Sequence, residues 1–131
     1  MGNIWSKISS ISGGNNQRYA GRTVAISGDG QVIAVGQDLN SNNLNRGPIY
    51  IYKRTGNNNW AQVGTGLSGD EQSRFGSSIS LSKDGKILAV GAPENGNGYV
   101  CVYKLENNQW VQIGSRLVGS NKQYQLSLIH I

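Results

Sequence analysis

The stretch SKDGKILAVG at positions 82–91 has an earlier copy, SGDGQVIAVG, at positions 27–36, which is a shift of 55 positions from 27 to 82. Trp5 and Trp60 keep the same shift, and a third tryptophan, Trp110, follows Trp60 by 50 positions. The sequence therefore reads as an array of one unit, and each motif can be checked against its counterpart in the other copy. We expect a first repeat over 1–64, a second over 65–114 and the start of a third over 115–131.

The composition favours short strands joined by tight turns. The 131 residues, enough for one ordinary domain, include 19 glycines, and only 15% of them are charged. Asparagines also cluster at 42–43, 57–59 and 107–108. Glycine and asparagine tolerate the positive φ that tight turns require. The net charge is +5, but the basic residues are scattered rather than clustered in a stripe, so we expect no nucleic-acid partner.

Several classes of protein are disfavoured by simple counts. No apolar stretch approaches the roughly 18–20 residues of a membrane helix, so no membrane span is predicted. The residues after Met1 lack the basic and apolar regions of a signal peptide. Cys101 is the single cysteine and cannot form an internal disulfide. Its place in an apolar alternating run predicts a buried, unreactive thiol.

Each copy contains four segments with strand character. In the second copy, alternating or apolar runs predict strands over 78–82, 86–90, 99–104 and 110–113, separated by Asp-Gly and Asn-Asn turns. The first copy repeats the order over 23–27, 31–35, 48–53 and 60–63. No window shows apolar residues at helical spacing. The copies differ in length only between strands, for example over 37–46 against 92–97, as expected if loops cross the surface.

Four-stranded units of about 50 residues in tandem suit β-propeller blades. The pattern resembles the FG-GAP-like repeats of β-propeller proteins, the group that includes the integrin α-subunit head, over about residues 5 to 119. It is carried by Phe75-Gly76, ISLSKDG at 79–85, LAVGAP at 88–93, GYVCVY at 98–103 and WVQIG at 110–114. The first copy departs from it with Ala20-Gly21 and with Gly36-Gln37-Asp38. The resemblance implies an all-β chain of two four-stranded antiparallel blades plus a partial third, at an extracellular or cell-surface location.

The sequence contains a literal G-x-G-x-x-G string at 64–69, but it is not expected to bind a nucleotide. A nucleotide loop needs a helix after its last glycine, and here another strand segment follows. The counterpart string at 114–119 carries Arg116 in place of the central glycine. We interpret both strings as connecting segments between repeats.

Asp29 and Asp84 invite a calcium interpretation, because integrin-type copies of the repeat often carry an Asp-rich loop. Calcium takes six to eight oxygen ligands, and each of these loops offers only one serine and one aspartate. We favour a hairpin turn at both positions and expect no metal or other cofactor.

No catalytic set can be assembled from the sequence. His130 is the single histidine, and no paired carboxylates occur at matched positions. We therefore expect a protein that is not an enzyme, leaving open an active site in blades outside this chain. The tryptophans are expected to pack between units, with stacking on sugars as the alternative.

An up-and-down blade places its second-to-third loop and its link to the next blade at one end. These are the longest and most polar segments, and scaffolds commonly present binding residues on such loops. The predicted ligand-binding residues are Arg18, Asp38, Arg46, Asp70, Glu71, Arg74 and Glu94. The expected function is binding of a protein or another surface ligand through these loops, with a lectin-like repeat as the alternative.

The repeat pattern stops after Gly119. The chain ends QLSLIHI at 125–131, which resembles a translated sequencing adapter, so we expect the natural protein to continue differently there. A genuine closing strand is the alternative. Two repeats leave sheet faces uncovered, so we expect either further blades or self-association.

Overall fold

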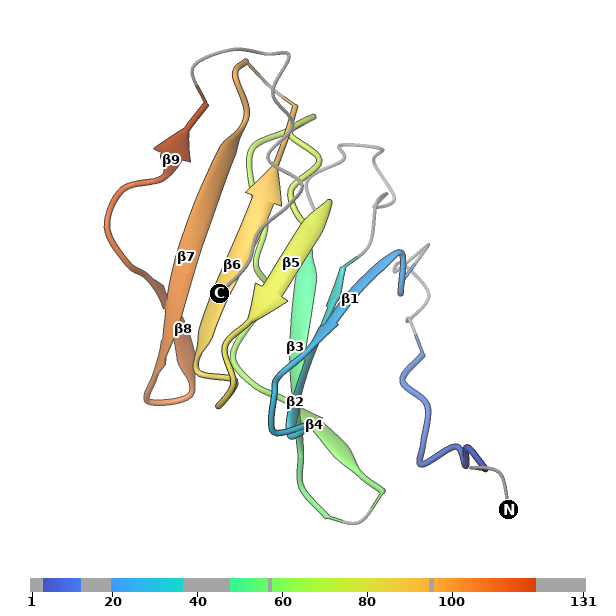
Figure 1. Cartoon of the computed structure of the whole chain (residues 1–131). Helices are drawn as coiled ribbons and strands as arrows, with labels where there is room; N and C mark the ends of the chain where they lie inside the picture. Colours follow the sequence, from blue (N-terminus) through green and yellow to red (C-terminus); the bar gives the residue numbers. More distant parts are fainter. Residues whose placement is uncertain (1–3, 13–19, 37–47, 57, 95, 120–131) are drawn as a thin grey trace.

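The computed structural model describes residues 4–12, 20–36, 48–56, 58–94 and 96–119, and these contain nine β-strands and no helix (Figure 1). The strands are β1 (Thr23–Ile26), β2 (Val32–Gly36), β3 (Ile49–Arg54), β4 (Trp60–Gln62), β5 (Ser78–Leu81), β6 (Ile87–Ala92), β7 (Tyr99–Glu106), β8 (Gln109–Gln112) and β9 (Leu117–Val118). The all-β prediction is confirmed. Within these residues there is no helix with the length and apolarity to cross a membrane.

The strands form two antiparallel sheets, each in chain order. The first sheet is β1-β2-β3-β4, and the second is β5-β6-β7-β8 with β9 also paired to β7. Corresponding residues pair in the two sheets: Ala34 with Ile51 and Ala89 with Val102. The eight predicted strands begin and end within two residues of the observed ones. β9 was not predicted, because two residues that pair beyond an irregular step carry no alternation pattern.

The Ser-x-Asp-Gly stretch folds into a hairpin turn in each sheet. In the first turn the Ser27 hydroxyl and the Gln31 backbone N–H both donate to Asp29 Oδ1, at 2.6 and 3.0 Å. The Val32 N–H in turn donates to Ser27 Oγ at 3.0 Å. The second turn, 82–87, repeats all three bonds. The predicted turns are confirmed, and their side chains replace the backbone partners that the tight chain reversal leaves without a bond.

The two sheets pack face to face, with β5 lying against β1 and β2 (Figure 1). Residues paired across neighbouring strands point to the same side of a sheet, so the register assigns each residue to a side. The core between the sheets combines Val32, Ala34, Ile49 and Ile51 of the first sheet with Leu81, Leu88, Val90, Cys101, Tyr103 and Trp110 of the second. A Cβ at Gly36 would lie 3.3 Å from the Gly76 carbonyl oxygen, which shows how closely the backbones approach.

The chain reversals divide the molecule into two ends. We call the end with the turns 27–31, 82–86 and 107–108 the hairpin end, which lies at the bottom of Figure 1. The opposite end, the loop end, carries the β4–β5 link, the β6–β7 loop and the segment that enters β9. This arrangement follows from antiparallel strands in chain order, and it matches the predicted arrangement for the second copy. The predicted loop 37–46 of the first copy lies outside the described residues.

Candidate functional site

The loop end brings together three parts of the chain that are far apart in the sequence: 69–77, the described residues 92–94 and 96–98, and 114–119. The Glu94 N–H donates to the Ser73 carbonyl at 3.1 Å, which ties the β6–β7 loop to the β4–β5 link. The Gly119 N–H donates to the Gly98 carbonyl at 3.0 Å, which ties the third segment to the second. Backbone bonds therefore join these segments into one surface.

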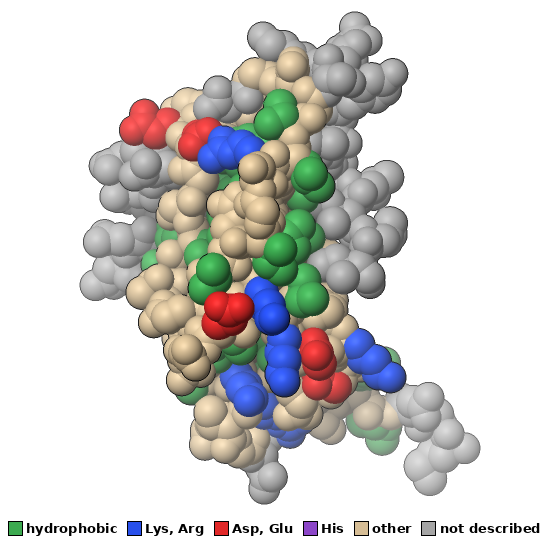
Figure 2. Space-filling model, turned by 90° about the vertical axis from the view of Figure 1, so that its left-hand side faces the viewer, with side chains coloured by type: hydrophobic (Ala, Val, Ile, Leu, Met, Phe, Trp, Pro, Cys, Tyr) green, Lys and Arg blue, Asp and Glu red, His purple; other side chains and the backbone are tan. Residues whose placement is uncertain are grey.

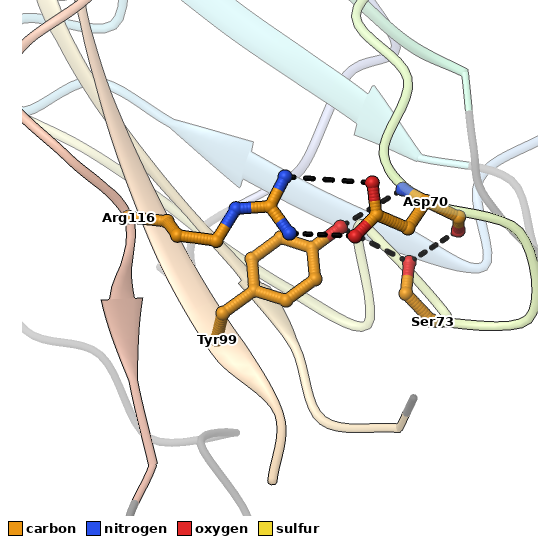
Figure 3. Close-up of polar contacts among 4 residues, drawn as sticks. All are labelled: Asp70, Ser73, Tyr99 and Arg116. Carbon is orange, nitrogen blue, oxygen red and sulfur yellow. Dashed lines mark hydrogen bonds and ion pairs between the residues drawn. The ribbon is translucent and has the colours of Figure 1, made fainter. Parts of the chain in front are cut away.

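An ion pair crosses this surface between Arg116 and Asp70 (Figure 3). Arg116 Nη1 donates to Asp70 Oδ2 at 2.6 Å, and Nη2 lies 3.4 Å from Oδ1. Two nitrogens facing two oxygens give the pair a fixed orientation as well as attraction. The side chains are 40% and 47% exposed, so the pair remains accessible from solvent.

The ion pair rests on the buried ring of Tyr99. The Arg116 guanidinium lies 3.9 Å from the centre of that ring, a cation–π arrangement. The Tyr99 hydroxyl accepts from the Asp70 backbone N–H at 2.9 Å and donates toward Ser73 Oγ at 3.3 Å. Ser73 Oγ donates to the Asp70 carbonyl at 2.7 Å. Tyr99 and Ser73 are buried, so a rigid base positions a charged, exposed pair.

The electrostatics of the pair follow from these contacts. The hydrogen bond from Arg116 lowers the pKa of Asp70, and the same contact raises the pKa of Arg116. Both groups are therefore charged throughout the physiological range. Charged groups of this kind can form ion pairs and hydrogen bonds with other polar groups.

A second ion pair lies on the same surface. Arg74 Nη1 is 3.5 Å from Glu94 Oε1, with side-chain exposures of 34% and 58%. Arg74 and Gln72 both have positive φ, at 56° and 60°, which non-glycine residues adopt only where the surrounding structure holds them. Gly69 is equally constrained, because a Cβ there would lie 2.6 Å from the Tyr99 hydroxyl. The loop shape is thus fixed by local packing.

Four of the predicted ligand residues lie on this surface. Asp70, Arg74 and Glu94 form the two ion pairs, and Glu71 belongs to the same β4–β5 link. The other three, Arg18, Asp38 and Arg46, lie outside the described residues.

Tyr99, Ser73 and Arg116 were not among the predicted site residues. Tyr99 reads as an ordinary member of an alternating strand, so its sequence position gives no sign of a role at the surface. Arg116 had one visible signal, because it stands where the first copy has Gly66.

The three tryptophans have different environments. Trp110 is buried between the sheets, and its Nε1 donates to the Val63 carbonyl at 3.2 Å, as expected for packing between units. Trp60 is half-buried, and its Nε1 donates to Ser9 Oγ at 2.8 Å. Trp5 is 96% exposed. The packing interpretation thus holds for Trp110, contact with segment 4–12 takes its place at Trp60, and the interpretation is wrong for the exposed Trp5.

The remaining motifs have structural explanations. The string 64–69 passes along the edge of β3, where Leu67 pairs with Ile49, and leads to β5. Hydrogen bonds lower the pKa of Asp29, chiefly from Ser27, and that of Asp84, chiefly from the Lys86 N–H. Cys101 is buried and its thiol pKa is raised by that burial. Within the described part of the chain, no three His, Cys, Asp or Glu residues lie close enough together to hold a metal ion.

A scan against protein-family models found no match for this chain, and none of the curated proteins matched it.

Proposed function

We propose that the chain is a non-catalytic binding module that recognises a protein or another surface ligand through its loop end. The two sheets would be neighbouring blades of an FG-GAP-like β-propeller, a proposal supported by the corresponding register of the sheets and by their face-to-face packing. In such a scaffold the sheets supply rigidity and the loops supply recognition.

One observation carries the proposal: a rigid, exposed set of charges at the loop end. Arg116 and Asp70 are held on a buried tyrosine, with Arg74 and Glu94 nearby on the same joined segments. Preorganised charged groups lose little conformational entropy on binding, which favours recognition of polar partners. The hairpin end also carries charged side chains, but its aspartates Asp29 and Asp84 accept hydrogen bonds within their own turns.

A glycan-binding repeat is the second candidate, and Trp60 is the observation that favours it. Trp60 borders a hollow of about 250 Å³ that is also lined by Val24, Val35 and residues of segment 4–12. A half-exposed indole beside a hollow of this kind can stack on the apolar face of a sugar ring.

The test screens the immobilised chain against a displayed random-peptide library and against a glycan array. Substitution of Arg116→Ala or Glu94→Ala should weaken a selected peptide at least about tenfold, the cost of one charged interface contact. The matched control is Asp84→Ala at the hairpin end, which should leave binding unchanged. A chain that selects no peptide, or one whose peptide binding depends on Asp84 and not on Glu94, contradicts the proposal. Glycan binding that is lost in Trp60→Phe would support the second candidate.

A further inference from the structure

The inference concerns the two sheet sides that face away from the shared core, and it is independent of the function proposed for the loop end. In the first sheet, the outer side carries Val24, Ile26, Ile33, Val35, Tyr50, Tyr52 and Trp60. Their counterparts in the second sheet are Ile79, Leu81, Leu88, Val90, Cys101, Tyr103 and Trp110, which are the residues that pack against the first sheet. The same sequence positions therefore face away from the core in one sheet and into it in the other.

Exposure follows this difference in surroundings. Ile26 is 59% exposed, whereas its counterpart Leu81 is 8% exposed. Val24 is 60% exposed, whereas Ile79 is half-buried and packed against the core. Large apolar side chains in adjacent positions at this level of exposure are typical of an interaction surface.

On the outer side of the second sheet, the relation is reversed: its apolar residues face outward, and their counterparts in the first sheet face the core. This outer side carries Ile87, Val100, Val102, Val111, Ile113 and Leu117, whose counterparts in the first sheet include the core residues Val32, Ile49 and Ile51. Leu117 is 64% exposed and Ile113 is 46% exposed, whereas Leu67, the counterpart of Leu117, packs against the core. Figure 2 views the molecule from the side of β9 and shows apolar side chains along its length, with most of the charged ones toward its lower end.

We infer that the outer side of the second sheet binds the outer side of the first sheet of another copy of this chain. The template for this contact is the interface inside the molecule, where the counterparts of these two surfaces already pack against each other. Because each copy offers two different surfaces, the contact is head-to-tail, and it generates a ring or an open stack.

Segment 4–12 occupies part of the binding side. Ser9 accepts from Trp60 Nε1, just as the Val63 carbonyl accepts from Trp110 Nε1 in the internal interface. In the proposed contact, Trp60 takes the role of Trp110, and Ile113 of the second copy takes the role of Val63. Ser9 therefore occupies the position that Ile113 of the second copy would take. Association therefore requires the segment to leave Trp60, and the emission of Trp60 should change with protein concentration.

The experiment uses light scattering after size-exclusion chromatography, on the full chain from about 1 to 500 µM, the range in which weak interfaces dissociate. The first-sheet variant carries Val24→Lys and Ile26→Lys, and the second-sheet variant carries Ile113→Lys and Leu117→Lys. The control carries Asn58→Lys and Thr65→Lys, which add the same charge at exposed loop positions. All six positions are exposed, so the three variants should retain the wild-type circular dichroism and melting transition.

Wild type and control should exceed the 14.1 kDa of one chain as concentration rises, and each sheet variant alone should remain at that mass. An equimolar mixture of the two sheet variants should give a particle of two chains and nothing larger, because each retains one intact surface. A wild type that stays monomeric over the whole range overturns the inference. So does a second-sheet variant that dimerises alone, which would mean pairing of like surfaces, or a mixture that stays monomeric.

Discussion

Gly30 and Gly85 occupy the same place in their turns and share the same φ of 73°, but their surroundings differ. Nothing lies within 4 Å of where a Cβ would stand at Gly30, whereas a Cβ at Gly85 would collide with the side chain of Val32 in the first sheet. Glycine is therefore required at position 30 only for the turn. At position 85 it is required both for the turn and for the packing of the two sheets.

Gly30→Ala and Gly85→Ala should accordingly differ in cost. A left-handed alanine costs roughly 1–2 kcal/mol, so that loss is expected for both variants. Gly85→Ala should lose about 1–3 kcal/mol more, because Val32 must move within a packed core. Urea denaturation followed by circular dichroism measures both free energies of unfolding. Equal losses would mean that the turn at 82–86 does not contact the first sheet.

Asp70 and Arg116 make a small, pH-dependent contribution to stability. The pKa of Asp70 is lowered in the folded state, so its contribution is present above the unfolded value of about 3.9 and is lost as the pH falls below it. With both side chains more than a third exposed, Asp70→Asn should cost at most about 1 kcal/mol at pH 6. The difference from wild type should vanish near pH 2 and shrink in 1 M salt. A difference that persists at low pH would assign the effect to packing.

At the scale of elements, the sequence allowed most strands and turns to be predicted. Alternating runs and Asp-Gly turns gave β1 to β8, because their side-chain period and turn chemistry are local properties. β9 could not be predicted from such local patterns. It forms by pairing with residues 99–100 of β7, a part of that strand that β8 leaves unpaired. The site was predicted in part: topology placed Asp70 and Glu94 at one end, but the support from Tyr99 depends on a contact between segments 29 residues apart.

Trp110 and Trp60 are counterparts whose environments differ, and single-tryptophan proteins should show it. The experiment compares three proteins. Each keeps a single tryptophan, Trp5, Trp60 or Trp110, and carries phenylalanine at the other two positions. Acrylamide quenching should be strongest for Trp5, intermediate for Trp60 and weakest for Trp110, following their exposure. Trp110 should also emit at the shortest wavelength. Equal quenching of Trp60 and Trp110 would show that the second sheet does not cover its tryptophan.

At the scale of the whole molecule, the fold consists of two similar sheets that pack face to face. Which side of each sheet is covered could not be predicted from the sequence, because Val24 and Ile26 are as apolar as their counterparts Ile79 and Leu81. Which of two equivalent surfaces is covered depends on which neighbours are present, and that is a property of the assembly. The two outer sheet sides of this molecule therefore follow from the same packing that forms its core.

The most direct test of that packing compares one sequence position in both sheets. In a Cys101→Ala background, Ile26→Cys and Leu81→Cys place a thiol at corresponding positions, and the rate of modification by a thiol reagent is measured at low protein concentration. Packing of the second sheet on the first predicts that the Ile26→Cys protein reacts at nearly the rate of the denatured chain. The Leu81→Cys protein should react at least about 100-fold more slowly, because its thiol is reached only by local unfolding. Equal and rapid reaction at both positions in the folded protein would contradict the account.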